Sequence, residues 1–166
     1  MSHKKSVCVV VGADGDLPIM QGAIDKLKYF GVPFSVRVVS AHRTPYQAEE
    51  LAKTAREKGV GVIIAAAGKA AHLAGVLAAY TTLPVIAVPL KASTLDGLDA
   101  LLSMVQMPTG VPVATVAIDG AANAGILAAQ ILSVEDPELT DKLAAFKDEM
   151  TAEYMRKDAE AVNRNW

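Results

Sequence analysis

Five short apolar runs, rich in valine, isoleucine and alanine, constrain the fold of this chain more than any other feature. They span Val7–Val11, Phe34–Val39, Val60–Ala65, Val85–Val88 and Val113–Ile118. The runs hardly alternate with polar residues, which is typical of strands buried on both faces of a parallel sheet. Helix-like segments separate them, at Leu17–Phe30, Pro45–Lys58, Ala70–Tyr80, Leu95–Val105, Ala121–Ser133 and from Pro137 onward. This βα alternation predicts an α/β fold, a doubly wound flavodoxin-like or Rossmann-like sandwich, with a five-stranded parallel sheet and helices on both faces.

Length and composition fit a single domain of 166 residues, with 1–5 expected to be disordered and 137–166 to form a C-terminal helical tail. The net charge of −2 gives no reason to expect a nucleic-acid partner. We expect no membrane segment, because no run of about 18 apolar residues is free of charges and turn residues. The single cysteine, Cys8, cannot form an internal disulfide. A reducing, cytoplasmic location follows as the simplest interpretation.

Several helix ends are legible in the sequence. Thr44 and Gln47 fit a capping box around Pro45, Asp16 fits an N-cap, and Gly31 fits a C-terminal stop. The tail repeats apolar residues at helical spacing, from Leu139 to Tyr154. Two interpretations of that apolar stripe stay open, packing on its own subunit or on a neighbouring one.

Three of the strand-ending loops combine polar residues with helix starts. They are "GADGD" at 12–16, "SAHR" at 40–43 and "AAGKAAHLAG" at 66–75. Ligands of open α/β sheets bind beyond the carboxyl ends of the strands, where free N–H groups of helix N-termini favour anions. In a 2-1-3 strand order these three loops would be neighbours.

The residue types in these loops suit a phosphorylated ligand. An arginine such as Arg43 binds phosphate or carboxylate through its planar fork, and a histidine such as His42 exchanges protons near neutral pH. Each also has an ordinary structural interpretation: a surface histidine, a solvated arginine, and for Asp16 a helix cap. No GxGxxG, P-loop, zinc-ligand or GxSxG pattern is present. The residues alone therefore indicate an α/β enzyme for a small phosphorylated ligand, with His42 as the proton-transfer candidate.

The segments "SAHRTP", "AAHLAG" and "LLSMVQMPTGVPVATVAI" make the chain similar to the PurE family, over residues 7–132. The version with "AAHL" resembles its mutases rather than its carboxylases that use free carbon dioxide. The resemblance implies a mutase of purine biosynthesis that moves a carboxylate from the exocyclic amine of 5-aminoimidazole ribonucleotide to a ring carbon. It implies no cofactor, metal or ATP. It also implies a homo-octamer with sites at subunit junctions and the C-terminal helix on a neighbour.

Site residues follow from the same resemblance. His42 corresponds to the catalytic histidine, Arg43 to the phosphate-binding arginine, Asp16 to the ribose-binding aspartate and His72 to a histidine that closes over the base. The full predicted substrate-binding set is Gly12, Ala13, Asp16, Ser40, Ala41, Arg43, Gly68, Lys69, His72 and Leu73.

Two binding loops depart from the family pattern. The first normally reads Gly-Ser-x-Ser-Asp, so Ala13 and Gly15 lack hydroxyls and Asp14 adds a negative charge. In the third, Lys69 replaces a glycine. Lys69 supplies a charge to the ligand, pairs with Asp14, or blocks the usual ring; the sequence leaves all three open. Three functions stay open accordingly: a mutase with rearranged contacts, a paralogue that carboxylates or decarboxylates another heterocycle, and a binding protein without turnover.

Overall fold

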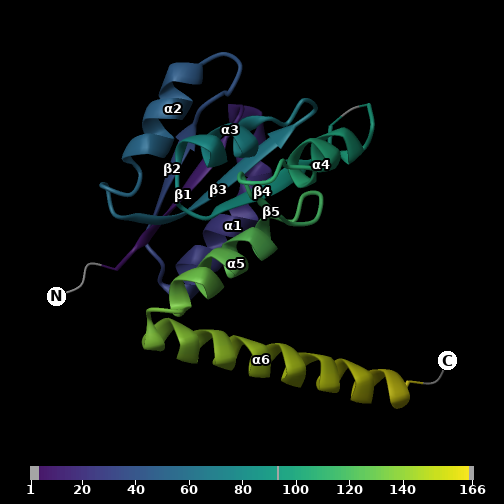
Figure 1. Cartoon of the computed structure of the whole chain (residues 1–166). Coiled ribbons are helices and arrows are strands. Elements are labelled where there is room, and N and C mark those ends of the chain that lie inside the picture. Colours follow the sequence, from purple (N-terminus) through teal and green to yellow (C-terminus); the bar gives the residue numbers. More distant parts are fainter. Residues whose placement is uncertain (1–3, 93, 165–166) are drawn as a thin grey trace.

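One parallel sheet of five strands forms the centre of the computed structural model, which describes residues 4–92 and 94–164. The strands are β1 (Ser6–Val11), β2 (Phe34–Val38), β3 (Val60–Gly68), β4 (Val85–Leu90) and β5 (Ala114–Thr115). Their order is β2-β1-β3-β4-β5, and every neighbouring pair is parallel (Figure 1). The doubly wound, flavodoxin-like prediction is confirmed, and the sheet has the 2-1-3 order that would make the three loops neighbours.

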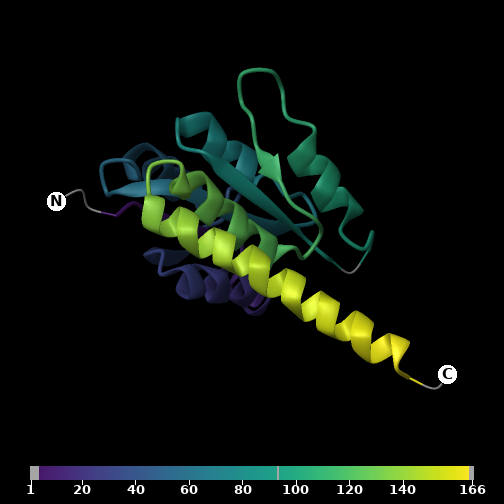
Figure 2. The same ribbon diagram turned by 90° about the horizontal axis from the view of Figure 1, so that it is seen from below.

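Helices cover both faces of this sheet. They are α1 (Leu17–Phe30), α2 (Pro45–Thr54), α3 (Leu73–Tyr80), α4 (Leu98–Val105), α5 (Ala121–Ser133) and α6 (Pro137–Val162), with a 3₁₀ turn at Asp14–Asp16. α2, α3 and α4 lie on one face, and α1 and α5 pack together on the other (Figure 1). From below, α6 crosses the α1/α5 layer and continues past the domain (Figure 2).

The apolar runs are continuous because alternate residues of one strand serve two separate cores. Val7, Val9 and Val11 of β1 face α1 and α5, whereas Cys8 and Val10 face the α2/α3 layer. All five are buried. Each fully buried valine stabilises the fold by about 1.5–3 kcal/mol relative to exposure. Cys8 is a free thiol buried in the core, and this burial raises its pKa.

Some sequence-based boundaries and exposures are wrong. β5 has two residues rather than six, and α2, α3 and α4 are each shorter than predicted. The expected burial on both faces fails for β2, where Val36 and Val38 are exposed, because β2 is an edge strand. Apolar composition alone does not distinguish an edge strand from a central one.

The two predicted N-terminal caps form no capping hydrogen bond, whereas the predicted C-terminal stop at Gly31 is confirmed. Thr44 lies at the N-cap of α2 but caps no helix N–H; its hydroxyl accepts from Ser40 N–H (2.9 Å) and donates to Ser40 O (3.0 Å). Asp16 precedes α1 without capping it. Gly31 ends α1 in the left-handed conformation, at φ 70°, as glycine does readily.

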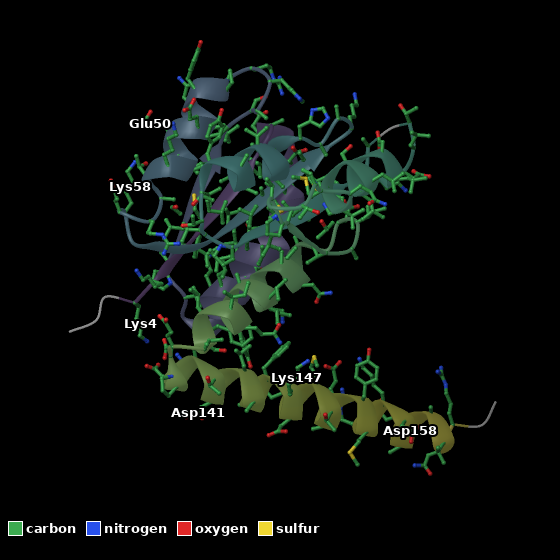
Figure 3. The ribbon with its side chains drawn as sticks, viewed as in Figure 1. Lys4, Glu50, Lys58, Asp141, Lys147 and Asp158 are labelled. Carbon is green, nitrogen blue, oxygen red and sulfur yellow. The ribbon has the colours of Figure 1, made fainter. Side chains whose placement is uncertain are left out.

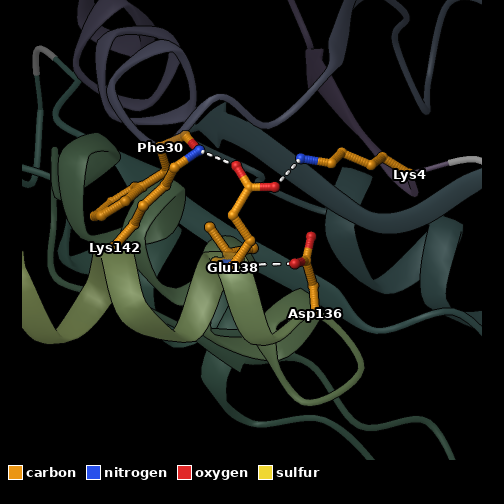
Figure 4. Close-up of polar contacts among 6 residues, drawn as sticks. Lys4, Phe30, Asp136, Glu138 and Lys142 are labelled. Carbon is orange, nitrogen blue, oxygen red and sulfur yellow. Dashed lines mark hydrogen bonds and ion pairs between the residues drawn. The ribbon is translucent and has the colours of Figure 1, made fainter.

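The first turns of α6 are attached to the domain. Leu139 and Phe146 are buried against the α1/α5 layer, and the Glu138 carboxylate accepts from Lys4 Nζ (3.0 Å) and Lys142 Nζ (2.9 Å) (Figure 4). These two lysines lower the pKa of Glu138 to about 2. Lys4 and Lys5 belong to the segment predicted to be disordered, whose residues 1–3 lie outside the described part.

Beyond Phe146 the tail is exposed, and one side-chain hydrogen bond still reaches it from the domain, from the Tyr29 hydroxyl to Glu149 Oε2 (2.5 Å). Every residue from 147 to 162 is exposed, and Figure 3 shows Lys147 and Asp158 on the stretch of α6 that leaves the domain. The structure therefore supports self-packing of the tail as far as Glu149 and leaves the exposed residues that follow available to another surface. None of the described helices has the length and apolarity needed to cross a bilayer.

Candidate functional site

A cavity of about 310 Å³ opens at the carboxyl ends of four adjacent strands. Loops that follow β1, β2, β3 and β4 line it, as the 2-1-3 order led us to expect. Of the predicted site residues, ten line this cavity: Gly12, Ala13, Asp16, Ser40, Ala41, His42, Arg43, Gly68, Lys69 and Leu73. His72 is not among the lining residues and reaches the site through His42.

The loop after β2 is a compact turn that presents Arg43. Ser40 Oγ accepts from the backbone N–H of Arg43 at 3.1 Å and from its Nε at 3.4 Å. Arg43 Nη2 also lies 3.5 Å from the carbonyl oxygen of Gly12, on the neighbouring loop. Ser40 therefore orients the guanidinium toward the first loop, and the remaining donors of Arg43 stay available for an anion.

Two histidines from different loops meet beside the cavity. His42 Nε2 lies 2.8 Å from His72 Nδ1, and the rings stand edge to face at 4.9 Å between centroids. At this distance one nitrogen must carry the hydrogen and the other must accept it. The contact thus couples the tautomer of His42 to that of His72, and it leaves His42 Nδ1 to face other partners. Such a pair can hold, release and take back one proton.

The first loop carries the acidic residue of the site. The N–H of Gly12 donates to Ala66 O at 3.1 Å, which joins the loops after β1 and β3. Burial raises the pKa of Asp16, and the negative charge of Asp14 raises it further. Asp14 itself is exposed and does not line the cavity. The repulsion of phosphate that an inward-facing Asp14 would cause is therefore absent from this arrangement.

Lys69 has a backbone conformation that a side chain makes costly. Its φ is 56°, in the left-handed region, at the point where the chain leaves β3 and turns toward α3. For a residue with a Cβ this conformation costs roughly 1–2 kcal/mol relative to a right-handed one. The geometry explains why a glycine fits this position in the family pattern. Within residues 4–92 and 94–164, Lys69 forms no ion pair, so the proposed pairing with Asp14 is wrong.

Sequence reasoning missed the contribution of the fourth strand. Five additional lining residues are Ala67, Ala70, Leu90, Lys91 and Ala92. Lys91 Nζ pairs with Asp96 Oδ1 at 3.2 Å, and Lys91 N–H donates to Asp119 Oδ1 at 2.9 Å. The sequence could have indicated Lys91 as a site residue, because it directly follows a buried strand at the sheet edge where the other loops lie. In the described part of the chain, no three metal-binding side chains converge on one point.

The fold and this cavity define a flavodoxin-like protein whose loops place a histidine pair, an arginine and two lysines at the carboxyl edge of its sheet. Residues 6–153 match the family described as AIR carboxylase. The chain is 50% identical over 165 residues to the N5-carboxyaminoimidazole ribonucleotide mutase of Pyrococcus horikoshii, covering 99% of this chain and 93% of that one. It is 54% identical over 151 residues to the Thermotoga maritima protein of the same name, covering 91% and 88%.

A solved structure agrees with these relatives. The crystal structure of Treponema denticola PurE superposes with a TM-score of 0.83 at 26% identity, covering 96% of this chain and 99% of that one. The chain therefore belongs to the AIR carboxylase family, and its resemblance to PurE proteins is confirmed.

Proposed function

We propose that this chain is an N5-carboxyaminoimidazole ribonucleotide mutase of purine biosynthesis. It moves a carboxylate from the exocyclic amine of 5-aminoimidazole ribonucleotide to a ring carbon. Half of the residues are identical to a mutase of that name over 99% of the chain. The cavity with His42, Arg43 and Asp16 on its walls is the single structural observation that best supports this function.

The reaction needs one proton to leave and return. When the N–CO₂ bond breaks, the exocyclic nitrogen gains a proton and carbon dioxide is released. When the ring carbon attacks that carbon dioxide, a C–C bond forms and the ring carbon loses its hydrogen as a proton. His42 supplies the first proton and removes the second, so the histidine ends as it began. The His72 contact couples the tautomer of His42 to that of His72.

The remaining site residues act on the parts of the substrate that do not react. Arg43, oriented by Ser40, binds the phosphate as a planar fork of donors. Asp16 accepts hydrogen bonds from ribose hydroxyls. Gly12, Ala13 and Gly68 let the backbone approach the nucleotide closely, because they have small side chains or none. No cofactor takes part.

Exposed apolar side chains support an oligomer, which we propose is the octamer of the PurE resemblance. Four exposed residues form one face of α4 and the loop before it: Leu95, Leu98, Leu102 and Val105. Met150, Tyr154 and Met155 are exposed on α6 beyond Glu149. An exposed apolar face on each of two elements indicates contacts with other copies. The free tail then packs on a neighbouring subunit, and the protein acts in the cytoplasm, where its single buried thiol stays reduced.

The test is direct. Purified protein is incubated with the carboxylated aminoimidazole ribonucleotide, and its interconversion with the N-carboxy isomer is followed without ATP or metal. We expect turnover by the wild type and none by His42→Asn, with nucleotide binding retained. Unchanged turnover in His42→Asn would refute the role of His42. No turnover by a folded, assembled wild type would favour a paralogue that acts on another heterocycle.

A further inference from the structure

Lys69 is an exposed cation on the wall of the cavity that has no ion-pair partner within residues 4–92 and 94–164. Three cations line the cavity: Arg43, Lys69 and Lys91. Arg43 donates to Ser40 Oγ and lies within reach of Gly12 O, and Lys91 pairs with Asp96. Among the described residues, Lys69 has neither an ion pair nor a side-chain hydrogen bond. Its backbone has a positive φ, which is unfavourable for a residue with a side chain.

The strand order separates Lys69 from the phosphate end of the site. Arg43 follows β2 and Lys69 follows β3, with β1 between them. Neighbouring strands lie about 4.8 Å apart, so the two cations start from strand ends roughly 10 Å apart. A ligand that satisfies both must carry negative charge at two separated points. Asp16 stands on the intervening loop, so a neutral, hydroxyl-bearing middle part suits the centre.

We propose that Lys69 binds the substrate carboxylate and makes the site discriminate between carboxylated and uncarboxylated aminoimidazole ribonucleotide. This inference rests on the proposed function, because it takes the two anionic groups to be the phosphate and the carboxylate of that substrate. The ammonium group forms a charge-assisted hydrogen bond to the carboxylate, which is stronger than a bond between neutral groups. The uncarboxylated nucleotide lacks this partner and leaves Lys69 solvated.

The proposal is tested by the ratio of two dissociation constants. Calorimetric titration measures the binding of 5-aminoimidazole ribonucleotide and of its carboxylated product to the wild type and to Lys69→Gly. We expect Lys69→Gly to weaken binding of the carboxylated nucleotide about 10- to 150-fold, the range of one hydrogen bond to a charged group. Binding of the uncarboxylated nucleotide should change less than about 2-fold. Lys69→Arg should restore much of the preference, since it restores the charge.

Lys91→Met is the matched control, because it removes a cation of the same cavity that already has a partner in Asp96. It should alter the ratio less than Lys69→Gly does. Equal weakening of both nucleotides by Lys69→Gly, or no change in either, would overturn the proposal. The same preparations are assayed for turnover. If the wild type shows no turnover but Lys69→Gly changes the ratio of dissociation constants, the role of Lys69 stands and the mutase function is refuted. If the wild type shows turnover but Lys69→Gly leaves that ratio unchanged, the mutase function stands and the role of Lys69 is refuted.

Discussion

Replacing Lys69 by glycine should stabilise the free protein while it impairs ligand recognition. The φ of 56° costs a residue with a Cβ roughly 1–2 kcal/mol. Glycine avoids that cost, but it loses more backbone entropy on folding, by roughly 0.5–1 kcal/mol. The expected net gain is about 1 kcal/mol. For a chain of 166 residues, this corresponds to a rise in Tm of about 2–4 °C.

Lys69→Ala separates the backbone effect from the charge. Alanine removes the same ammonium group but keeps the Cβ, so any relief of repulsion from Arg43 or Lys91 affects both variants equally. Calorimetry and urea unfolding, at one protein concentration and without nucleotide, should place the glycine variant about 1 kcal/mol above the alanine variant. Equal stability of the two would refute the argument from strain.

Three further predictions concern pH, the tail and assembly. Burial raises the pKa of Asp16, so the folded protein gains stability as the pH falls from the raised pKa of the folded state toward the unfolded value of 3.8. Asp16→Asn should therefore be more stable than the wild type at pH 7. Thermal melts should show this difference in stability shrinking as the pH falls toward 3.8. The lowered pKa of Glu138 has the opposite sign, so Glu138→Gln should reduce stability above pH 4.5, and the difference should narrow as the pH falls to about 2. Leu98→Glu with Leu102→Glu should lower the mass seen by light scattering, because it charges the exposed face of α4; an unchanged mass would place the interface elsewhere.

The strands could be predicted because a buried parallel sheet leaves a strong apolar pattern, but that pattern does not determine the strand order. Under the condition of a 2-1-3 order the loops after β1, β2 and β3 were expected to be neighbours, and the structure has that order and brings them together. The hydrogen bond between His42 and His72 could not be predicted, because it depends on the relative placement of two loops thirty residues apart. No local pattern encodes that placement.

Local hydrogen-bond competition explains the failed helix cap at Thr44. The hydroxyl of Thr44 bonds the backbone of Ser40, which shapes the turn that presents Arg43, and so it is unavailable to α2. Sequence reasoning recognised the residue type and misjudged its partner. Lys69 shows the converse case: the departure from the family pattern singled out this position, and the structure shows there the positive φ that suits glycine.

The account depends most on the claim that the carboxylate migrates within one closed site. The N-carboxy isomer should therefore be converted in buffer that contains ¹³C-bicarbonate, and the product carboxylate should be analysed by mass spectrometry at early times. We expect a product that retains the unlabelled carboxylate of the substrate. Incorporation of the label at the level of the buffer would contradict the mutase and indicate a carboxylase that uses free carbon dioxide.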